Sequence, residues 1–172
     1  MSDKIKILFQ PSDLAGVGHF RSIWPAQEMQ KQFKNDFDIK INANINFNDL
    51  NALKKYDIIH FHRALGPHER IKEIFKELKD AGVTLIMDLD DYWEPPTTHP
   101  MYHAVKEQKI SEKIIETMKM SDYVTTTTEL FAKEIRAHNK NVLIMPNAID
   151  TSHKMWKKED VEETDKLRVS WI

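Results

Sequence analysis

The sequence contains no cysteine among its 172 residues, which excludes a disulfide framework and a metal site built on thiolates. It also lacks an excess of positive charge, since 25 lysines and arginines face 27 aspartates and glutamates. Nucleic-acid-binding domains usually carry a basic excess, so we expect no nucleic-acid partner. No apolar run approaches the ~20 residues that a membrane-crossing helix needs, and we expect no membrane span.

We also expect no secretion signal. Met1–Lys4 leads directly into a short apolar run, without the long apolar stretch and cleavage site of a signal peptide. We therefore expect a soluble, cytoplasmic protein.

Glycine is scarce, and its four residues all fall at junctions between predicted elements. Gly16 and Gly18 follow the first apolar run, and Gly66 follows a later one. Gly82 stands just after Ile71–Leu78, in which apolar residues recur at helical spacing. Gly82 is therefore predicted to end a helix.

Strand-like and helix-like segments alternate along the chain. Strands are predicted over residues 5–9, 38–45, 57–62, 83–89, 123–127 and 142–145. Helices are predicted from Ser22, as N-cap, to about Phe33, around Ile71–Leu78, and over 101–120 and 129–137. This alternation predicts an α/β fold, in which helices cover both faces of a parallel sheet.

Polar residues gather in the segments that follow the predicted strands. In open α/β sheets, ligands bind in the crevice beyond the carboxyl ends of the strands. The segments concerned are 16–21, 62–66, 88–96, 126–129 and 146–150. The pattern predicts one site, formed by these five segments.

The segment Gly16–Arg21 lies between the first predicted strand and the first predicted helix, where phosphate-binding loops occur. Glycine lets the backbone approach an anion, and a helix N-terminus directs N–H groups at it. His19 and Arg21 are candidate donors to a phosphate or sugar beside Gly16 and Gly18. The alternative is a plain tight turn. Arg21 stands where a dinucleotide fingerprint has its third glycine, which disfavours dinucleotide binding.

Two histidines occupy the strand predicted over 57–62. Alternation places His60 and His62 on the same face, which permits a metal site. No carboxylate or third histidine lies nearby in the sequence, so we expect no metal. The alternative has His60 hydrogen-bonded within the sheet and His62 pointing into the crevice. His62 and Arg63 end the strand and are predicted to contact a ligand.

Three carboxylates, Asp88, Asp90 and Asp91, stand at the end of the strand predicted over 83–89. Close like charges raise one another's pKa, so they need a cation, a sugar hydroxyl or an arginine such as Arg63 nearby. These residue types predict a ligand-binding role for this segment.

Two aromatic residues follow these carboxylates. Tyr92 and Trp93 offer flat apolar rings of the kind on which sugars stack, and both are predicted to bind substrate. The alternative is a helix cap or turn with packed aromatic rings.

The order of the segments resembles that of a known family. The chain reads Asp57–His62, then a strand ending in Asp90-Asp91, then Ser121–Thr125 before a helix start at Thr128, then Met145–Asp150. This order is similar to that of the N-terminal Rossmann-like domain of GT-B glycosyltransferases of the glycogen synthase-like kind. The resemblance covers nearly the whole chain.

The resemblance implies the acceptor-side half of an enzyme that transfers a sugar from a nucleotide-sugar co-substrate to a glycan or other acceptor. Such enzymes usually retain the anomeric configuration and need no essential metal or other cofactor. Asp90 and Asp91 occupy the family's His-Asp position and are predicted as catalytic residues, although Asp90 replaces the usual histidine. Gly16 and Gly18 would approach the donor's phosphate or sugar.

The same resemblance bears on the C-terminal part. Asn147 is predicted to contact substrate in the family's Pro-Asn-Gly motif, in which Ala148 replaces the glycine. We expect a Rossmann-like acceptor-side domain over 1–150, a charged linker over 151–166, and over 167–172 the first strand of a missing second domain. That C-terminal domain, or a partner chain, would hold most of the donor, so the isolated chain is expected to be inactive.

Two alternatives from other classes stay open at this point. One is a non-catalytic glycan-binding or assembly module that keeps the fold. The other is a haloacid dehalogenase-like phosphatase, with Asp88 and Asp90 as its paired aspartates. Tyr92 stands where that motif has threonine, which disfavours the phosphatase.

Overall fold

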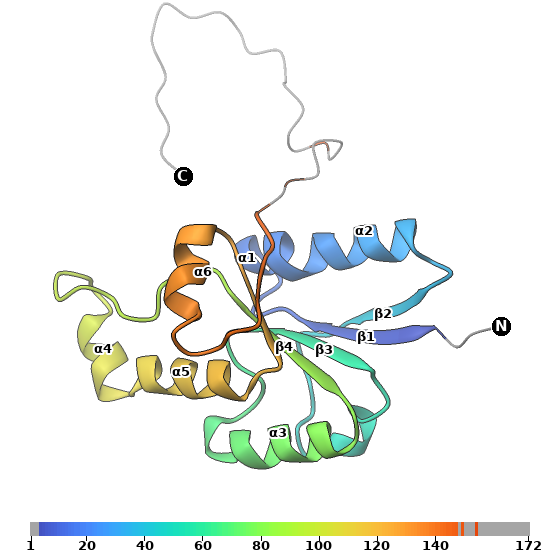
Figure 1. The fold of residues 1–172 in the computed structure, drawn as a ribbon, viewed down its shortest axis with the longest axis horizontal. Helices are drawn as coiled ribbons and strands as arrows, with labels where there is room; N and C mark the ends of the chain where they lie inside the picture. The colour runs from blue at the N-terminus through green and yellow to red at the C-terminus, as the bar shows by residue number, and fades with distance from the viewer. Residues whose placement is uncertain (1–3, 148, 150–153, 155–172) are drawn as a thin grey trace, which may run out of the picture.

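The structure, a computed structural model, describes residues 4–147, 149 and 154. At its centre is one six-stranded sheet in the order β2-β1-β3-β4-β5-β6, and all neighbouring strands are parallel (Figure 1). The strands are β1 (Ile5–Gln10), β2 (Phe37–Ile41), β3 (Ile58–His62), β4 (Thr84–Leu89), β5 (Tyr123–Thr126) and β6 (Val142–Ile144). The predicted α/β, Rossmann-like fold is confirmed.

Helices lie on both faces of this sheet, as Figure 1 shows for α2 and α3. The α-helices are α1 (Gly16–Gly18), α2 (Trp24–Gln32), α3 (Ile71–Asp80), α4 (Tyr102–Glu107), α5 (Ile110–Met120) and α6 (Glu129–Ile135). A π-helical segment, η1 (His19–Ile23), joins α1 to α2, and two short 3-10 turns are η2 (Leu50–Ala52) and η3 (His68–Arg70).

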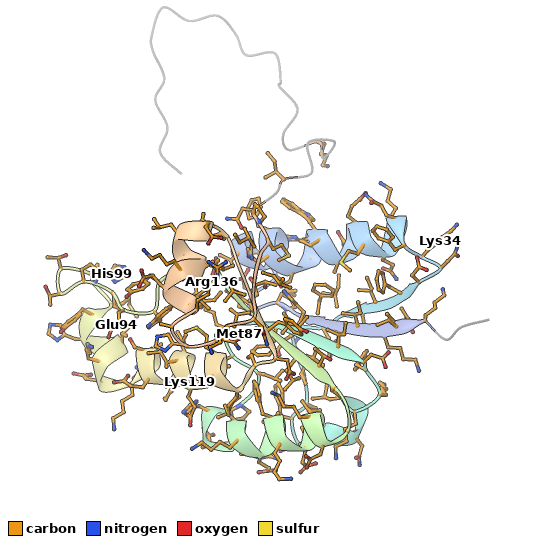
Figure 2. The ribbon with its side chains drawn as sticks, in the orientation of Figure 1. Lys34, Met87, Glu94, His99, Lys119 and Arg136 are labelled. Atoms are coloured by element: carbon orange, nitrogen blue, oxygen red, sulfur yellow. The ribbon has the colours of Figure 1, made fainter. Side chains whose placement is uncertain are left out.

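The larger core lies between the sheet and α3, α5 and α6. Phe61, Ile74, Met87 and Ile135 are fully buried there. Figure 2 shows Met87 deep among side chains, whereas charged residues such as Lys34 lie at the periphery. Burial of apolar side chains of this size supplies most of the free energy that holds α3, α5 and α6 on the sheet.

The opposite face of the sheet has a smaller apolar core and a polar centre. Ile7, Phe9 and Ile39 pack with Ala26 of α2. Farther along the same face, the aligned positions of β3, β4 and β5 carry His62, Asp88 and Thr125, and all three are buried. Because buried polar groups need partners, this face is organised by hydrogen bonds at the end where the strands finish.

The first helix begins earlier than predicted. It starts at Gly16 rather than Ser22, and runs through η1 into α2. The carboxylate of Asp13 stabilises this start, because its Oδ1 accepts hydrogen bonds from the N–H of Ala15 (2.8 Å) and of Gly18 (3.2 Å). Pro25 has no N–H to donate and follows the widened turns of η1.

Two other predicted elements are shorter than expected. The second strand ends at Ile41, because Asn42 and Asn46 each accept a bond from the backbone N–H two residues later and turn the chain. The helix predicted over 101–120 is divided into α4 and α5 at Lys109, whose φ of 52° is left-handed.

The predicted ends of two other helices are confirmed. Gly82 follows α3 with a φ of 84°, a conformation that favours glycine. Thr128 caps α6, since its Oγ1 accepts a bond from the N–H of Phe131 (3.2 Å). The linker predicted over 151–166, apart from Lys154, and the strand predicted over 167–172 lie outside the described residues. Among the described helices, none is long and apolar enough to cross a membrane.

Candidate functional site

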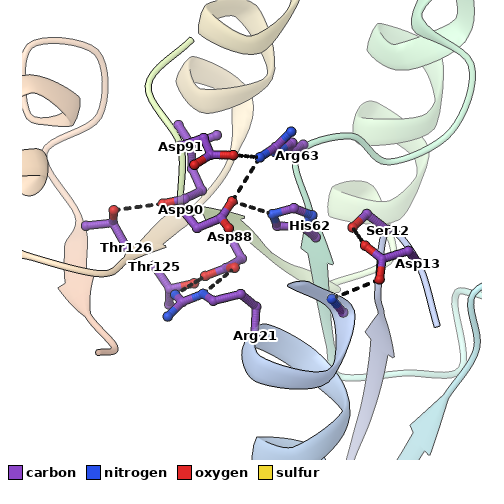
Figure 3. A network of polar contacts seen from close by, with 12 residues as sticks. Ser12, Asp13, Arg21, His62, Arg63, Asp88, Asp90, Asp91, Thr125 and Thr126 are labelled. Atoms are coloured by element: carbon purple, nitrogen blue, oxygen red, sulfur yellow. Dashed lines mark hydrogen bonds and ion pairs between the residues drawn. The ribbon is translucent and has the colours of Figure 1, made fainter. Parts of the chain in front are cut away.

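Four of the predicted site residues, His62, Arg63, Asp90 and Asp91, meet at the carboxyl ends of β3 and β4. Figure 3 shows Arg63 and His62 at the end of β3 facing Asp90 and Asp91, which follow β4. His62 Nε2 lies 2.8 Å from Asp90 Oδ1, and Arg63 Nη2 donates to the same oxygen at 3.2 Å. Arg63 Nη2 also pairs with Asp91. The two strand ends are thereby joined by a network of four charged or titratable side chains.

These contacts control the charge of Asp90. Burial by itself raises the pKa of Asp90, but the hydrogen bond from His62 and the charges of His62 and Arg63 lower it to about 2. Asp90 is therefore ionised throughout the physiological range. Asp91 is far more accessible, since 71% of its side chain is exposed. Of the two predicted catalytic residues, Asp91 presents its carboxylate to solvent and Asp90 mainly contacts His62 and Arg63.

The backbone at Arg63 is left-handed, with a φ of 61°. This conformation is costly for a residue with a Cβ atom, and such residues gather at functional sites. It lets the chain turn at the end of β3, so that the guanidinium reaches the carboxylates that follow β4. Sequence reasoning placed Arg63 near these carboxylates, and the ion pairs with Asp90 and Asp91 are observed.

Asp88 lies apart from the other two carboxylates. It is fully buried within β4 and forms an ion pair with Arg21 of η1. Arg21 Nε donates to Asp88 Oδ2 at 2.9 Å, and Nη2 donates to Oδ1 at 2.6 Å. Thr125 Oγ1 also donates to Oδ1 at 2.6 Å. The expectation that these carboxylates need a cation, a sugar hydroxyl or an arginine nearby is met for Asp88 by Arg21 rather than Arg63, and Asp88 is buried instead of lying at the mouth of the crevice.

Arg21 also holds the segment that follows β6. Its Nη1 donates to the backbone carbonyl of Met145 and to Asn147 Oδ1, the latter at 3.0 Å. The guanidinium that we predicted as an anion donor is buried and bonded on several sides within the chain. The side chain of Asn147, predicted to bind substrate, is bonded to Arg21 while the residue itself is exposed. Nothing in the sequence indicates that Arg21 pairs with Asp88, which lies 67 positions later in the chain.

The glycines expected in a phosphate-binding loop belong to the first turn of the helix. A Cβ on Gly18 would lie 1.9 Å from the backbone oxygen of Asp13, so only glycine fits there without movement. Gly16 is exposed, with nothing within 4 Å of the Cβ position. The Asp13 carboxylate occupies the N–H groups of Ala15 and Gly18 that an anion would otherwise use. Sequence reasoning missed Asp13, although aspartate ahead of a helix is a capping signal.

His60 is engaged within the sheet, as one of our alternatives had it. Its Nε2 lies 3.1 Å from Thr125 Oγ1. Because the single hydroxyl proton of Thr125 goes to Asp88, Thr125 accepts this bond and His60 Nε2 carries a proton. Burial lowers the pKa of His60 to about 4, despite the opposing charge of Asp88, so the imidazole is neutral. Within the described part of the chain, no three His, Asp or Glu residues are placed to hold a metal ion.

The two aromatic residues of the site differ in exposure. Tyr92 is 52% exposed, whereas Trp93 is 6% exposed. Trp93 stacks on Phe131 of α6 with ring centroids 5.9 Å apart, and its backbone carbonyl accepts a bond from Ser111. The Tyr92 ring also packs against Trp93, with ring centroids 4.8 Å apart, but it stays about half exposed. Both rings therefore take part in the packing that the second alternative describes, and Tyr92 is the one that solvent reaches.

Several buried polar atoms near this crevice have no partner in the described chain. They are Gln10 Oε1, His19 Nδ1, Ser22 Oγ, His60 Nδ1, His62 Nδ1 and Arg63 Nε. They belong to the last residue of β1, to η1, to β3, or to the residue that follows β3. Buried polar groups are normally satisfied, so this concentration of exceptions makes the region a candidate site. Sequence reasoning missed Gln10 and Ser22, since neither residue type in isolation signals a site.

A separate groove of about 800 Å³ runs between α2 and the segment after β6. It is lined by Trp24, Pro25, Gln27, Glu28, Met29, Lys31, Gln32, Phe33, Met145, Pro146 and Ile149. None of the predicted site residues lines it. The polar crevice and this groove are therefore different surfaces of the domain.

Comparisons with known proteins give no family. No family model matches the chain, and no curated protein matches it. Among solved structures, the chain is similar to a conserved protein from Enterococcus faecalis V583, with 13% sequence identity and a TM-score of 0.41. The match covers 78% of this chain and 99% of that protein. A similarity this low carries no argument about function, and the fold rests on the structure itself.

Proposed function

We propose that this domain is the acceptor-side half of a GT-B-type glycosyltransferase, which transfers a sugar from a nucleotide-sugar donor to a glycan or other acceptor. The other half of the cleft belongs to a second domain or a partner chain. The proposal starts from the order of sequence motifs and is supported by the arrangement of the residues that they carry.

One observation carries the proposal: at the carboxyl ends of β3 and β4, Arg63 forms an ion pair with Asp91, and the next residue in the chain, Tyr92, is about half exposed. Carboxylates and guanidinium groups bind hydroxyls through directed hydrogen bonds, and the face of an exposed aromatic ring provides apolar contact area. A sugar ring presents hydroxyls at its edge and apolar C–H groups on its face, so its chemistry matches this surface.

The two candidate catalytic carboxylates have different roles in this proposal. Asp91 is accessible and reaches substrate directly. Asp90 is fixed by His62 and Arg63 and keeps a negative charge beside the reacting groups. The charge of Asp90 stabilises positive charge that develops nearby, as carboxylates do at sugar-transfer sites.

The phosphatase alternative is disfavoured by the position of Asp88. A nucleophilic aspartate must reach phosphorus, but Asp88 is fully buried and both of its carboxylate oxygens are bonded to Arg21. Substrate has no access to those oxygens without disruption of the buried pair.

Two assays test the proposal. The first measures hydrolysis and transfer of nucleotide-sugars by residues 1–172 and by the product of the intact reading frame that encodes them. We expect no turnover by residues 1–172, and transfer by a product that contains the second half of the cleft. Robust turnover by residues 1–172 would contradict the half-enzyme proposal. Saccharide binding without turnover by the intact product would instead favour the non-catalytic glycan-binding module.

The second assay measures ligand binding by NMR. Titration with glucans and with nucleotide-sugars should shift resonances of Arg63, Asp91 and Tyr92. Asp80, an exposed aspartate paired with Lys76 on α3, is the matched control for Asp91 because it lies away from the crevice. Asp91→Asn should weaken saccharide binding, and Asp80→Asn should leave it unchanged.

A further inference from the structure

The groove between α2 and the segment after β6 has two walls that the fold holds in place (Figure 1). On one side, α2 is anchored by Ala26, which packs with apolar side chains of β1 and β2. On the other side, Met145 donates its backbone N–H to the carbonyl of Thr126 at 2.7 Å, and the Met145 carbonyl accepts a bond from Arg21. Because both walls are fixed on the sheet, the groove of about 800 Å³ is preformed.

The lining of the groove suits an apolar side chain. Phe33 is 46% exposed and Ile149 is 47% exposed, and both belong to this lining. Among the described residues that line the groove, the charged ones are Glu28 and Lys31, which pair with each other at 3.5 Å. The lining therefore has no net charge with which to attract an ion. Apolar surface gathered in one exposed hollow marks an interaction site.

The chain itself carries a large apolar side chain close to this groove. Ile149 lines the groove, and Met155 and Trp156 follow it by six and seven residues. Over residues 150–166, the only other apolar residue is Val161. Burial of an indole ring removes about 150–250 Å² of surface from water, which favours contact with apolar surface nearby. The groove is the apolar surface that the chain passes as it leaves β6.

The short connection lets Trp156 reach any part of the groove. Seven residues span at most ~25 Å when extended, and the nine residues of α2 measure only ~14 Å along the helix. A short linker gives the group that it carries an effective concentration on the order of millimolar. A second copy of the chain reaches such a concentration only in concentrated solution. The chain's own segment is therefore the favoured occupant.

We propose that this groove binds Trp156, with Met155 beside it, and that the indole packs against Phe33 and Met29. Residues 155–172 lie outside the described part of the chain, so the contact adds a docking site to the domain. The proposal concerns a contact within the chain and does not depend on sugar transfer. A docked Trp156 restricts the directions in which the residues after it leave the domain.

The first test is NMR of the 172-residue chain labelled at its methionine methyl groups. Met29 and Met145 both line the groove. We expect nuclear Overhauser effects between these methyl groups and the Trp156 indole. Trp156→Ala should remove them and shift both methyl signals, because an aromatic ring next to a methyl group changes its chemical shift. Trp171→Ala is the matched control and should leave both signals in place.

Two results of this experiment would overturn the proposal. One is a Trp156→Ala variant in which the Met29 and Met145 signals do not move. The other is a shift of both signals in Trp171→Ala alone, which would place residues 167–172 in the groove instead.

A synthetic peptide of residues 150–160 separates the chain's own segment from a second copy. The peptide should bind the Trp156→Ala variant and restore the Met29 and Met145 signals. It should bind the unchanged chain at least ~10-fold more weakly, because the tethered segment competes for the groove. Equal affinity for the two chains would contradict the proposal. Methyl shifts of the unchanged chain that vary on dilution would show that a second copy occupies the groove, and would contradict it as well.

Variants of the lining locate the peptide. In the Trp156→Ala background, Phe33→Ser and Ile149→Ser alter opposite walls of the groove, and each should abolish peptide binding. Leu130→Ser is the control, since Leu130 is 79% exposed on α6 and does not line the groove. Phe33 also contacts the ring of Phe37, so Ile149→Ser decides the result if Phe33→Ser perturbs the fold. Peptide binding that persists in Ile149→Ser, or is lost in Leu130→Ser, would place the peptide elsewhere and overturn the proposal.

Discussion

Arg21 and Asp88 form a two-point ion pair beneath η1, with the guanidinium and the carboxylate both essentially inaccessible to solvent. The pair joins the first helix to the central strand β4. Through Met145 and Asn147 it also fixes the segment that leaves β6. A buried charge without its partner is costly, so this pair constrains how the two ends of the domain meet.

Removal of either partner should destabilise the protein strongly. We expect Arg21→Met and Asp88→Asn each to lower the free energy of unfolding by ~3–5 kcal/mol, because the remaining group loses its buried partner. Urea denaturation at pH 7 measures the change. Lys76→Met, which removes a cation from the exposed pair with Asp80, is the matched control and should have little effect. A loss in Arg21→Met no greater than in the control would show that water reaches the pair.

The two glycines of the first turn should respond in opposite ways to alanine. Gly18→Ala places a Cβ 1.9 Å from the Asp13 carbonyl oxygen, and we expect a loss of ~1–3 kcal/mol or more. Gly16→Ala has open space around it and replaces glycine in a helix, so stability should be unchanged or higher by ~0.5–1 kcal/mol. The urea concentrations at the unfolding midpoints of the two variants, compared with that of the unchanged protein, measure these differences in stability. Similar midpoints would mean that the Asp13 turn shifts easily.

Acid should destabilise the fold through His60. Its pKa is about 4 in the folded chain and 6.5 when unperturbed, so the unfolded state binds a proton more readily. The stabilisation is fully present above pH 6.5 and is lost as the pH falls toward 4, by a total of about 3 kcal/mol. Urea denaturation at pH 7, 5.5 and 4.5 should show this slope. His60→Gln should flatten it, and the exposed control His103→Gln should not.

The backbone at Arg63 gives a test of stored strain. Arg63→Ala and Arg63→Gly both remove the ion pairs with Asp90 and Asp91, but only glycine relieves the left-handed φ of 61°. We expect the glycine variant to be more stable than the alanine variant by about 1 kcal/mol. Differential scanning calorimetry of the two variants measures the difference. An alanine variant as stable as the glycine variant would indicate that the turn relaxes.

The sequence predicts those parts of the fold that depend on local pattern. Apolar runs such as Ile5–Phe9 identify the strands, the spacing within Ile71–Leu78 identifies α3, and Gly82 and Thr128 mark helix ends by their own chemistry. The left-handed Lys109 between α4 and α5 carries no such signal, because neither glycine nor proline stands there. The start of the first helix has no clear local signal, because Asp13 precedes Gly16 by three residues and two closely spaced glycines are typical of a loop.

The candidate site is predicted where the residues follow strand ends and missed where the partner is distant in the sequence. Parallel strands place His62, Arg63 and Asp90 at one edge of the sheet, which alternation and strand order already imply. The pairing of Arg21 with Asp88 depends on η1. In this π-helical segment three consecutive residues, Arg21, Ser22 and Ile23, are all buried. A π-helical turn has no simple sequence pattern, so the buried network beneath it emerges only in three dimensions.

Tyr92 and Trp93 should separate ligand binding from stability. Trp93 is packed against Phe131 and His138, so Trp93→Ala should lower the free energy of unfolding by ~3–5 kcal/mol. Tyr92 is about half exposed, so Tyr92→Ala should cost less than ~1 kcal/mol while it removes the apolar ring face offered to a sugar.

The readouts are urea denaturation and glucose titration followed by NMR. Tyr123→Ala is the matched control for Tyr92→Ala, since Tyr123 is 41% exposed at the opposite end of the sheet. We expect glucose binding to be lost in Tyr92→Ala and kept in Tyr123→Ala, at similar stability. Equal glucose binding in the two variants would show that the Tyr92 ring does not contact the sugar. Glucose binding would then depend on Arg63 and Asp91.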